Sequence, residues 1–433
     1  MRQFIRLFHN RQFTKLFYAN VTSKMGSVIG LTAFMYYVLD RFSNQPFYAS
    51  ITELMYSLPT LSVFFLVGVF ADRLDRQKIA YYCDWISACL SVGLLVAIYL
   101  GWMPLIFFVL FIRSAVQKFF FPAEQGLLQG ILKKDDFTAA AGINQLIESV
   151  FMLFGNALGI FIYWYLGIYG AVIIDIITLV ISGLCIKAMK IKQSIRNPNG
   201  SHSIKDLNLS IVWKDFKVGF EYMYKNKLLL SLIIGFIAFG IVNGGYSVMQ
   251  VFILKYKLAP SNYEQISIYF GIVFGSGVLI GSVVSSYLTQ KVKLYQLIIT
   301  SIFLIAFFTI MAAFVNNIIL FLGINFLIAF FLPMLNIAIG GWMPAIIEPQ
   351  MIGRVQGWIS PLMMLSQSIT LGAITIGFPT FFSVEAIFWL VGGCFLSVGI
   401  YYSFVLPRLA KVKEKEDNRR KMVENEKEVR LNY

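Results

Sequence analysis

The sequence contains twelve apolar stretches of roughly 20 residues, and this pattern constrains the fold more than any other feature. Of the 433 residues, 58% are hydrophobic and only 13% are charged, whereas soluble domains carry about 25% charged residues. A soluble fold could not bury that much apolar surface, but a bilayer can, because about 20 apolar residues span it as one helix. We therefore expect an all-α membrane protein with twelve transmembrane helices.

The predicted spans fall into two groups of six. They cover 15–39, 48–71, 79–100, 104–130, 139–165 and 168–190 in the first group, and 228–255, 265–288, 294–315, 318–346, 355–381 and 384–406 in the second. This divides the chain into a first half (1–190), a linker (191–227), a second half (228–406) and a charged tail (407–433).

The two halves share internal landmarks that indicate a duplication. Gly68 in the first half corresponds to Gly281 in the second, and Pro122 corresponds to Pro333. Two similar six-helix halves are typical of secondary transporters, which rock around a site near the middle of the membrane. In the linker, 206–227 carries apolar residues spaced among charges, which predicts an amphipathic helix on the membrane surface.

The positions of Lys and Arg predict the orientation in the membrane. Only Arg41, Lys255 and Lys257 lie in the loops that alternate with the termini, although the chain has 36 Lys and Arg residues. Positive charge concentrates on the cytoplasmic side of membrane proteins. We therefore expect a multi-pass protein of the cell membrane with both termini in the cytoplasm, and we do not attribute the net charge of +14 to nucleic-acid binding.

Cysteine and histidine usage argues against a metal centre or a catalytic triad. The four cysteines lie inside apolar stretches and form no Cys-x-x-Cys motif, and the only histidines are His9 and His202. No G-x-x-x-x-G-K-[ST] loop for ATP occurs in the sequence. We expect no enzyme activity, no metal and no cofactor, so an ATPase would have to be a separate chain.

The loop between the second and third spans reads Gly68-Val69-Phe70-Ala71-Asp72-Arg73-Leu74-Asp75-Arg76-Gln77-Lys78. It resembles the G-x-x-x-D-R-x-G-R-K loop of the major facilitator superfamily. In such a loop, glycine allows close helix approach, and Asp72 can accept hydrogen bonds from an arginine or from a helix N-terminus. This chain departs from the pattern at Asp75, where the superfamily usually has glycine.

Further segments resemble the macrolide-efflux and enterobactin-exporter branch of that superfamily. They are the Asp-Arg-Leu-Asp-Arg form of the loop, Phe121-Pro122-Ala123, Asn144, Asp175, and Gly353-Arg354-Val355-Gln356-Gly357. The resemblance implies proton-driven efflux of amphiphilic organic molecules, with drugs, siderophores and natural products all open as substrates. Glycines at 155 and 159 are similar to the antiporter motif of the fifth helix, but Ala157-Leu158 replaces its Gly-Pro pair.

Ionisable residues inside a span are costly and are therefore candidates for function. The candidates for proton coupling are Glu148, Glu53, Asp175, Arg113, Lys118 and Lys24, all in the first half. Counting ~1.5 Å per residue places Lys24 and Glu148 at similar depth, so Glu148 is expected to pair with Lys24 or Lys118. Fixed structural pairs are the alternative, and Asp175 is the candidate that fits it best.

Uncharged polar residues predict the walls of a substrate cavity. Asn20, Ser23, Lys24 and Ser27 share one face of the first span. The predicted cavity residues are Asn20, Ser23, Asn144, Asn243, Gln250, Asn325, Asn336 and Gln367. A few amides in apolar walls suit large, partly polar molecules.

We predict a monomeric transporter in the lipid bilayer that exports amphiphilic molecules in exchange for protons. A siderophore or lipid exporter, and a facilitator or importer of the same fold, are the alternatives. A non-transporting scaffold is disfavoured by the charges within the first half.

Overall fold

The computed structural model describes residues 2–41, 47–200, 209–378, 380–381 and 383–431. These residues are helical almost throughout. The helices are α1 (Arg2–His9), α2 (Arg11–Arg41), α3 (Phe47–Arg73), α4 (Arg76–Leu100), α5 (Met103–Gln117), α6 (Phe120–Ile131), α7 (Phe137–Lys187), α8 (Gln193–Arg196), α9 (Leu209–Lys225), α10 (Lys227–Ile253), α11 (Tyr263–Leu288), α12 (Leu294–Ala313), α13 (Ile318–Ile346), α14 (Ile352–Gly377) and α15 (Val384–Leu431).

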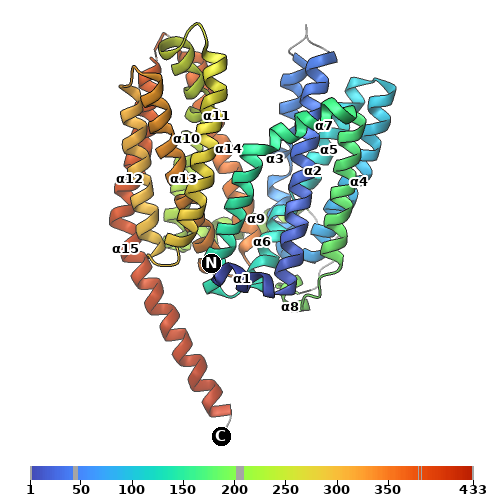
Figure 1. The fold of residues 1–433 in the computed structure, drawn as a ribbon. Coiled ribbons are helices and arrows are strands. Elements are labelled where there is room, and N and C mark those ends of the chain that lie inside the picture. Colours follow the sequence, from blue (N-terminus) through green and yellow to red (C-terminus); the bar gives the residue numbers. More distant parts are fainter. Residues whose placement is uncertain (1, 42–46, 201–208, 379, 382, 432–433) are drawn as a thin grey trace.

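The helices form the twelve predicted spans. Nine helical stretches within the described residues are long and apolar enough to cross a membrane. The more polar or less completely described helices α2, α3 and α14 pack alongside them. With α5 and α6 counted as one span and α7 as two, the all-α, twelve-helix prediction is confirmed (Figure 1).

Two spans differ from their predicted form for identifiable backbone reasons. The fourth span was expected as one helix over 104–130, but it breaks between α5 and α6 at Lys118 and Phe119. Pro122 explains the break, because its ring clashes with the carbonyl of residue 118 and it lacks the N–H that would bond there. Within α7, Gly167 adopts φ 65° and turns the chain between the fifth and sixth spans, a conformation that glycine adopts without steric cost.

Two of the contacts between the six-helix halves are related by the internal repeat. In one contact α3, the second span, packs on α14, the eleventh. In the other, the first part of α7, the fifth span, packs on α11, the eighth; there Ser149 and Ser282 share a buried hydrogen bond of 2.7 Å. Each span of the first half corresponds to the span six places later. The contact of the second span with the eleventh is therefore the counterpart of the contact of the eighth span with the fifth. In Figure 1 the halves approach each other near the end that carries the N-terminus and diverge toward the other end.

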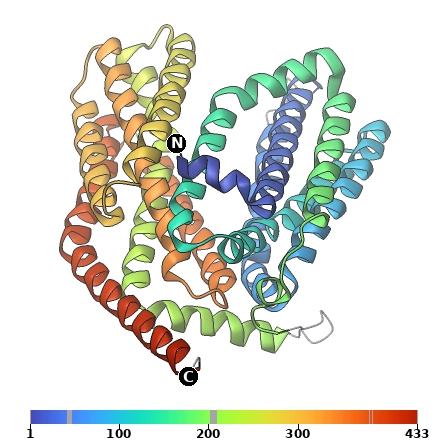
Figure 2. The same cartoon turned by 60° about the horizontal axis from the view of Figure 1, so that its bottom comes forward.

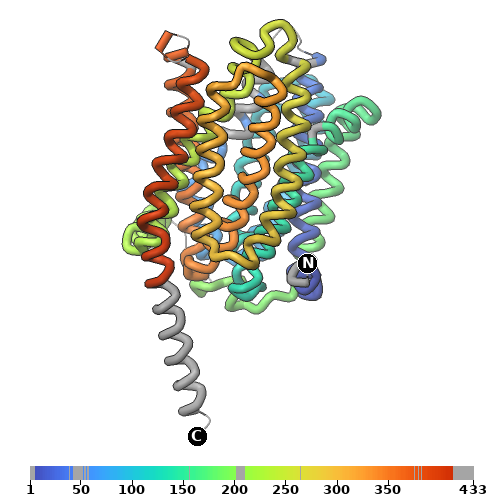
Figure 3. The backbone as a smooth tube through the Cα atoms, turned by 60° about the vertical axis from the view of Figure 1, so that its left-hand side comes forward, coloured from blue at the N-terminus to red at the C-terminus, as the bar shows by residue number. Residues whose placement is uncertain are grey.

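The linker and the last helix extend beyond the transmembrane bundle. Figure 2 shows α9, the helix predicted over 206–227, crossing from the first half toward the second; residues 206–208 lie outside the described residues. Figure 3 shows α15 along the outside of the second half. We expected this last span to end at 406, but α15 continues to Leu431. The tail is rich in Glu, Lys and Arg, which have high helix propensity, and this accounts for the extension.

Glycines set how closely α11 packs against α13. A Cβ on Gly281 would lie 2.1 Å from the backbone oxygen of Phe330, whereas a Cβ on Gly271 of the same helix would meet nothing within 4 Å. We expect Gly281→Ala to lower stability by about 1–3 kcal/mol, because the backbone of α13 has to move away. Gly271→Ala is the matched control. Thermal unfolding of the purified variants, followed by fluorescence-detected size exclusion, should show a lower midpoint for Gly281→Ala only.

Candidate functional site

A cavity of about 970 Å³ lies between the two halves. Its walls come from α2, α6 and α7 in the first half and from α10, α11, α13, α14 and α15 in the second. The second-half wall is mainly aromatic and aliphatic, including Phe236, Phe239, Phe270, Phe274 and Phe388. Cavities of this size and lining accept drug-sized organic molecules.

Most of the predicted cavity residues reach this space. The predicted amides that line the cavity are Asn20, Asn144, Asn243, Gln250, Asn325 and Asn336. Ser23 lines a smaller adjoining cavity of about 280 Å³, which shares Asn20 and Lys24 with the larger one. Gln367 is half-buried on α14 and lines neither of these two cavities. The side chain of Glu53 lies outside the described residues.

Lys24 and Glu148 form an ion pair across the cavity wall. The Nζ atom of Lys24 donates to Oε1 of Glu148, joining α2 to α7. The Glu148 side chain is 55% exposed and that of Lys24 is 34% exposed, so both face the open cavity. Of the two partners predicted for Glu148, the structure places Lys24 beside it. Lys118 lies at the break between α5 and α6 and takes part in no ion pair within the described part of the chain.

Arg113 and Asp175 form a second pair that lies away from the cavity. Arg113 Nη2 donates to Asp175 Oδ1 at 2.8 Å, and Ser91 donates to the other carboxylate oxygen at 2.8 Å. Both charged side chains are at most 5% exposed. Removing one partner of such a pair would strand a buried charge at a cost of several kcal/mol. This geometry favours the structural reading of Asp175.

Two buried carboxylates escaped the sequence inventory. Glu124 on α6 lines both cavities, and Asn20 donates to its Oε1. Asp84 on α4 is fully buried and accepts hydrogen bonds from Ser23 and Ser182. Both lie within predicted spans, so the rule that selected the other six ionisable residues would also have found them.

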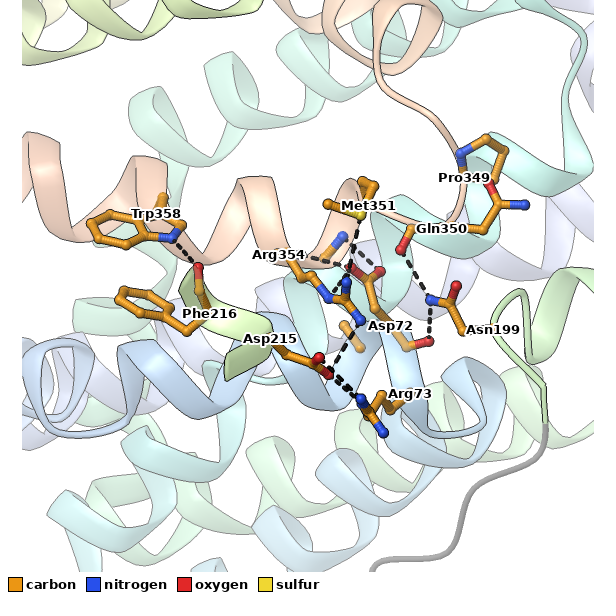
Figure 4. A network of polar contacts seen from close by, with 12 residues as sticks. Asp72, Arg73, Asn199, Asp215, Phe216, Pro349, Gln350, Met351, Arg354 and Trp358 are labelled. Carbon is orange, nitrogen blue, oxygen red and sulfur yellow. Dashed lines mark hydrogen bonds and ion pairs between the residues drawn. The ribbon is translucent and has the colours of Figure 1, made fainter. Parts of the chain in front are cut away.

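Asp72 joins the two halves on the side of the termini. Its Oδ1 accepts from the backbone N–H of Gly353 and its Oδ2 from that of Arg354, each at 2.9 Å. These N–H groups belong to the first turn of α14, which Met351 does not cap with its own side chain. The carboxylate of one half therefore caps a helix of the other half, where the helix dipole favours negative charge (Figure 4).

Arg76 and two glycines complete this contact. Arg76 is 1% exposed and donates to Asp72 at 3.0 Å, to Ala71 O at 2.9 Å and to Gly126 O at 3.2 Å. A Cβ on Gly68 would lie 2.5 Å from Gly353 O, so glycine is required where α3 crosses α14. We call this contact between Asp72, Arg76 and the start of α14 the gate.

The linker helix α9 binds both sides of the gate. Asp215 accepts from Arg73 of the first half at 3.0 Å and from Arg354 of the second half at 3.2 Å (Figure 4). One helical position further on, Phe216 stacks on Trp358 with ring centroids 4.0 Å apart, and Trp358 Nε1 donates to Phe216 O at 3.1 Å. The linker therefore adds charge and stacking to the contact between the halves.

Asp75, the departure from the loop pattern, has a local role. It caps α4 by accepting from the N–H groups of Gln77 and Lys78, and it pairs with Arg196 of the linker. The second carboxylate therefore ties the linker to the first half.

Comparison with known proteins identifies the family. Residues 16–369 match the family described as Major Facilitator Superfamily. The chain belongs to the major facilitator superfamily. The MFS-type transporter YkuC of Bacillus subtilis is 45% identical over 403 residues, covering 93% of this chain and 94% of that protein. Macrolide efflux protein A of Streptococcus pyogenes is 25% identical over 308 residues, covering 68% of this chain and 70% of that protein.

Solved structures of other superfamily transporters share the fold. A bacterial homologue of the iron transporter ferroportin in its outward-facing state aligns with a TM-score of 0.74 at 12% identity, covering 91% of this chain and 99% of that one. The transporter FucP in an outward conformation aligns with a TM-score of 0.67 at 11% identity, covering 88% and 98%. At these identities the likeness establishes the fold alone.

Because Asp215 pairs with an arginine of each half, replacing it tests whether α9 holds the gate closed. We expect Asp215→Asn to loosen the contact between the halves, because an uncharged amide cannot balance Arg73 and Arg354. Spin labels at the exposed positions Asp135 and Glu348, in a background without native cysteines, should report a new population at longer distance in this variant by double electron–electron resonance.

Glu221→Gln on the same helix is the matched control. Glu221 is exposed and pairs only with Lys225 within the described residues, and the hydrogen bond from Lys225 lowers the pKa of its carboxyl group. The Glu221→Gln variant therefore loses one charge on α9 and leaves the residues of the gate unchanged. Identical distance distributions in the Asp215→Asn and Glu221→Gln proteins would show that α9 does not hold the gate.

Proposed function

We propose that this superfamily member is a secondary transporter that exports amphiphilic organic molecules in exchange for protons. The observation that carries the proposal is the large apolar cavity between the halves, which bears a charged pair on one wall and is closed on one side by the gate. The similarity to macrolide efflux protein A supports efflux and an amphiphilic substrate.

The proposed orientation places both termini, the linker and the gate in the cytoplasm. It rests on the distribution of Lys and Arg between the loops. In that orientation the cytoplasmic side is closed and the cavity faces outward, which is the state in which an exporter releases its substrate. Opening the gate would then require α14 to leave Asp72 and Arg354 to leave Asp215, exposing the same cavity to the cytoplasm.

The proposed coupling site is the pair of Glu148 and Lys24. Both side chains are accessible from the cavity, so a proton from outside can reach the carboxylate. Protonation of Glu148 removes its attraction for Lys24 and frees the contact between α2 and α7. Because charges are costly within the membrane, a pair that separates as the protein changes shape favours proton uptake by the stranded carboxylate.

Glu148→Gln tests the coupling site. We expect the variant to lose accumulation of substrate against a gradient, by at least about tenfold, yet to retain passive exchange, because glutamine keeps the shape and hydrogen bonding of glutamate. The measurement is uptake of a fluorescent macrolide into inverted vesicles with an imposed pH gradient. Glu385→Gln is the control, since Glu385 also pairs with a lysine, Lys257 at 2.9 Å, but lies outside the cavity. Undiminished pH-driven uptake by the Glu148→Gln variant would show that protons are coupled at another site.

Cysteine labelling tests the orientation. In a background without native cysteines, a cysteine at the exposed position Tyr169 should react with an impermeant thiol reagent added to intact cells, and one at the exposed position Asp135 should react only after permeabilisation. Gln77 is unsuitable for labelling, because it is buried and donates to Ile186 O and Met189 O. Labelling of Asp135 in intact cells would reverse the proposed topology.

A further inference from the structure

The charges of the cavity wall are unevenly distributed and do not cancel. Lys24, Glu124 and Glu148 are the charged residues that line it among the described residues, and all three belong to the first half. Lys24 is engaged with Glu148, which leaves Glu124 without a salt-bridge partner in the described part of the chain. The second-half wall contributes no charged side chain from those residues. With all three groups ionised, the wall carries one net negative charge at Glu124.

Glu124 lies near the closed end of the cavity. It is five residues before Gln129, about 7.5 Å along the axis of α6. Gln129 donates to Pro344 O and Ile347 O at the end of α13, and so helps to join the two halves. The residue Glu124 is only 3% exposed, although it lines both cavities. Its carboxylate is therefore removed from bulk water but open to a molecule that enters the cavity.

Asn20 adds a second acceptor beside this carboxylate. Its Nδ2 donates to Glu124, and its Oδ1 is buried without a hydrogen-bond partner. With Glu124 ionised, the opposite amide orientation would turn one oxygen toward another, so the contact with the carboxylate favours this assignment. Asn20 is 3% exposed and lines both cavities. A buried acceptor without a donor is unfavourable, and an N–H group of a ligand would relieve this once the Asn20 side chain turned toward the cavity.

We propose that Glu124 and Asn20 form the subsite for a protonated amine on the transported molecule. The carboxylate balances the positive charge and the Asn20 oxygen accepts the N–H, while the aromatic second-half wall holds the apolar body. The inference rests on the proposed function and narrows its substrate class to amphiphiles that carry a basic amine. It also separates two tasks, with substrate charge recognised at Glu124 and the ion pair of Glu148 left to coupling.

Binding of matched probes tests this subsite without any gradient. The probes are a dansyl-labelled tertiary amine, its N-methyl quaternary analogue and its neutral amide analogue, titrated by fluorescence into the purified protein in lipid nanodiscs. We expect the tertiary amine to bind at least about tenfold more tightly than the neutral amide, as a charge-assisted hydrogen bond to a buried carboxylate predicts. The quaternary analogue should lie between them, because it keeps the charge but has no N–H for Asn20. Equal affinity for the amine and the amide would overturn the proposal.

Variants assign the preference to the named residues. Glu124→Gln should abolish the preference for the amine while leaving the affinity for the neutral amide unchanged, which also reports a folded protein. Asn20→Ser should reduce the discrimination between the tertiary and quaternary probes and keep the preference for charge. Glu385→Gln is the matched control and should keep both preferences, because Glu385 pairs with Lys257 and lines neither cavity. An amine preference that survives in Glu124→Gln, or that disappears in Glu385→Gln, would overturn the proposal.

The outcome is separable from that of the proposed function. If vesicles show no proton-driven export but the amine preference depends on Glu124, the subsite stands and the coupling proposal fails. If vesicles export the neutral amide as well as the amine and both bind alike, export stands and the subsite is overturned.

Discussion

The carboxylate of Asp72 and the first turn of α14 make the interaction on which this conformation depends. A helix N-terminus presents unpaired N–H groups, and α14 has no capping side chain of its own. Asp72 supplies that cap from the other half of the molecule, and Arg76 holds the carboxylate in place from behind. The cavity between the halves exists because they are joined at this end and along the contact between α7 and α11.

Because burying an unpaired charge is costly, the charged residues in the rest of the first half lie beside partners or face the cavity. Arg113 is paired with Asp175, Asp84 is surrounded by hydroxyl donors, and the pair of Lys24 and Glu148 faces the cavity. Glu124 differs from these groups, because its hydrogen-bond donor is the amide of Asn20. The halves have thus diverged in chemistry while keeping one architecture. The first carries the charges, and the second offers an aromatic wall.

In the proposed transport cycle, the linker would take part in opening the gate. Asp215 is shared between Arg73 and Arg354, so separation of the halves forces it to give up at least one partner. The stacking of Phe216 on Trp358 places an apolar contact beside the charges. These contacts of α9 stabilise the closed gate of this structure.

The sequence by itself determined the twelve spans, the duplication and the gate loop, because hydrophobic length and a short motif are local properties of the chain. It also predicted Lys24 or Lys118 as the partner of Glu148, since depth follows from counting residues along helices, and the packing of the helices decided for Lys24. It did not reveal the helix break at Lys118, the carboxylate of Asp215 shared between two arginines, or the hydrogen bond between Asn20 and Glu124. Those features join helices that are far apart in the chain, and only the packing of rigid helices decides which side chains meet. The same packing left the oxygen of Asn20 without a partner, which no count along the sequence could show.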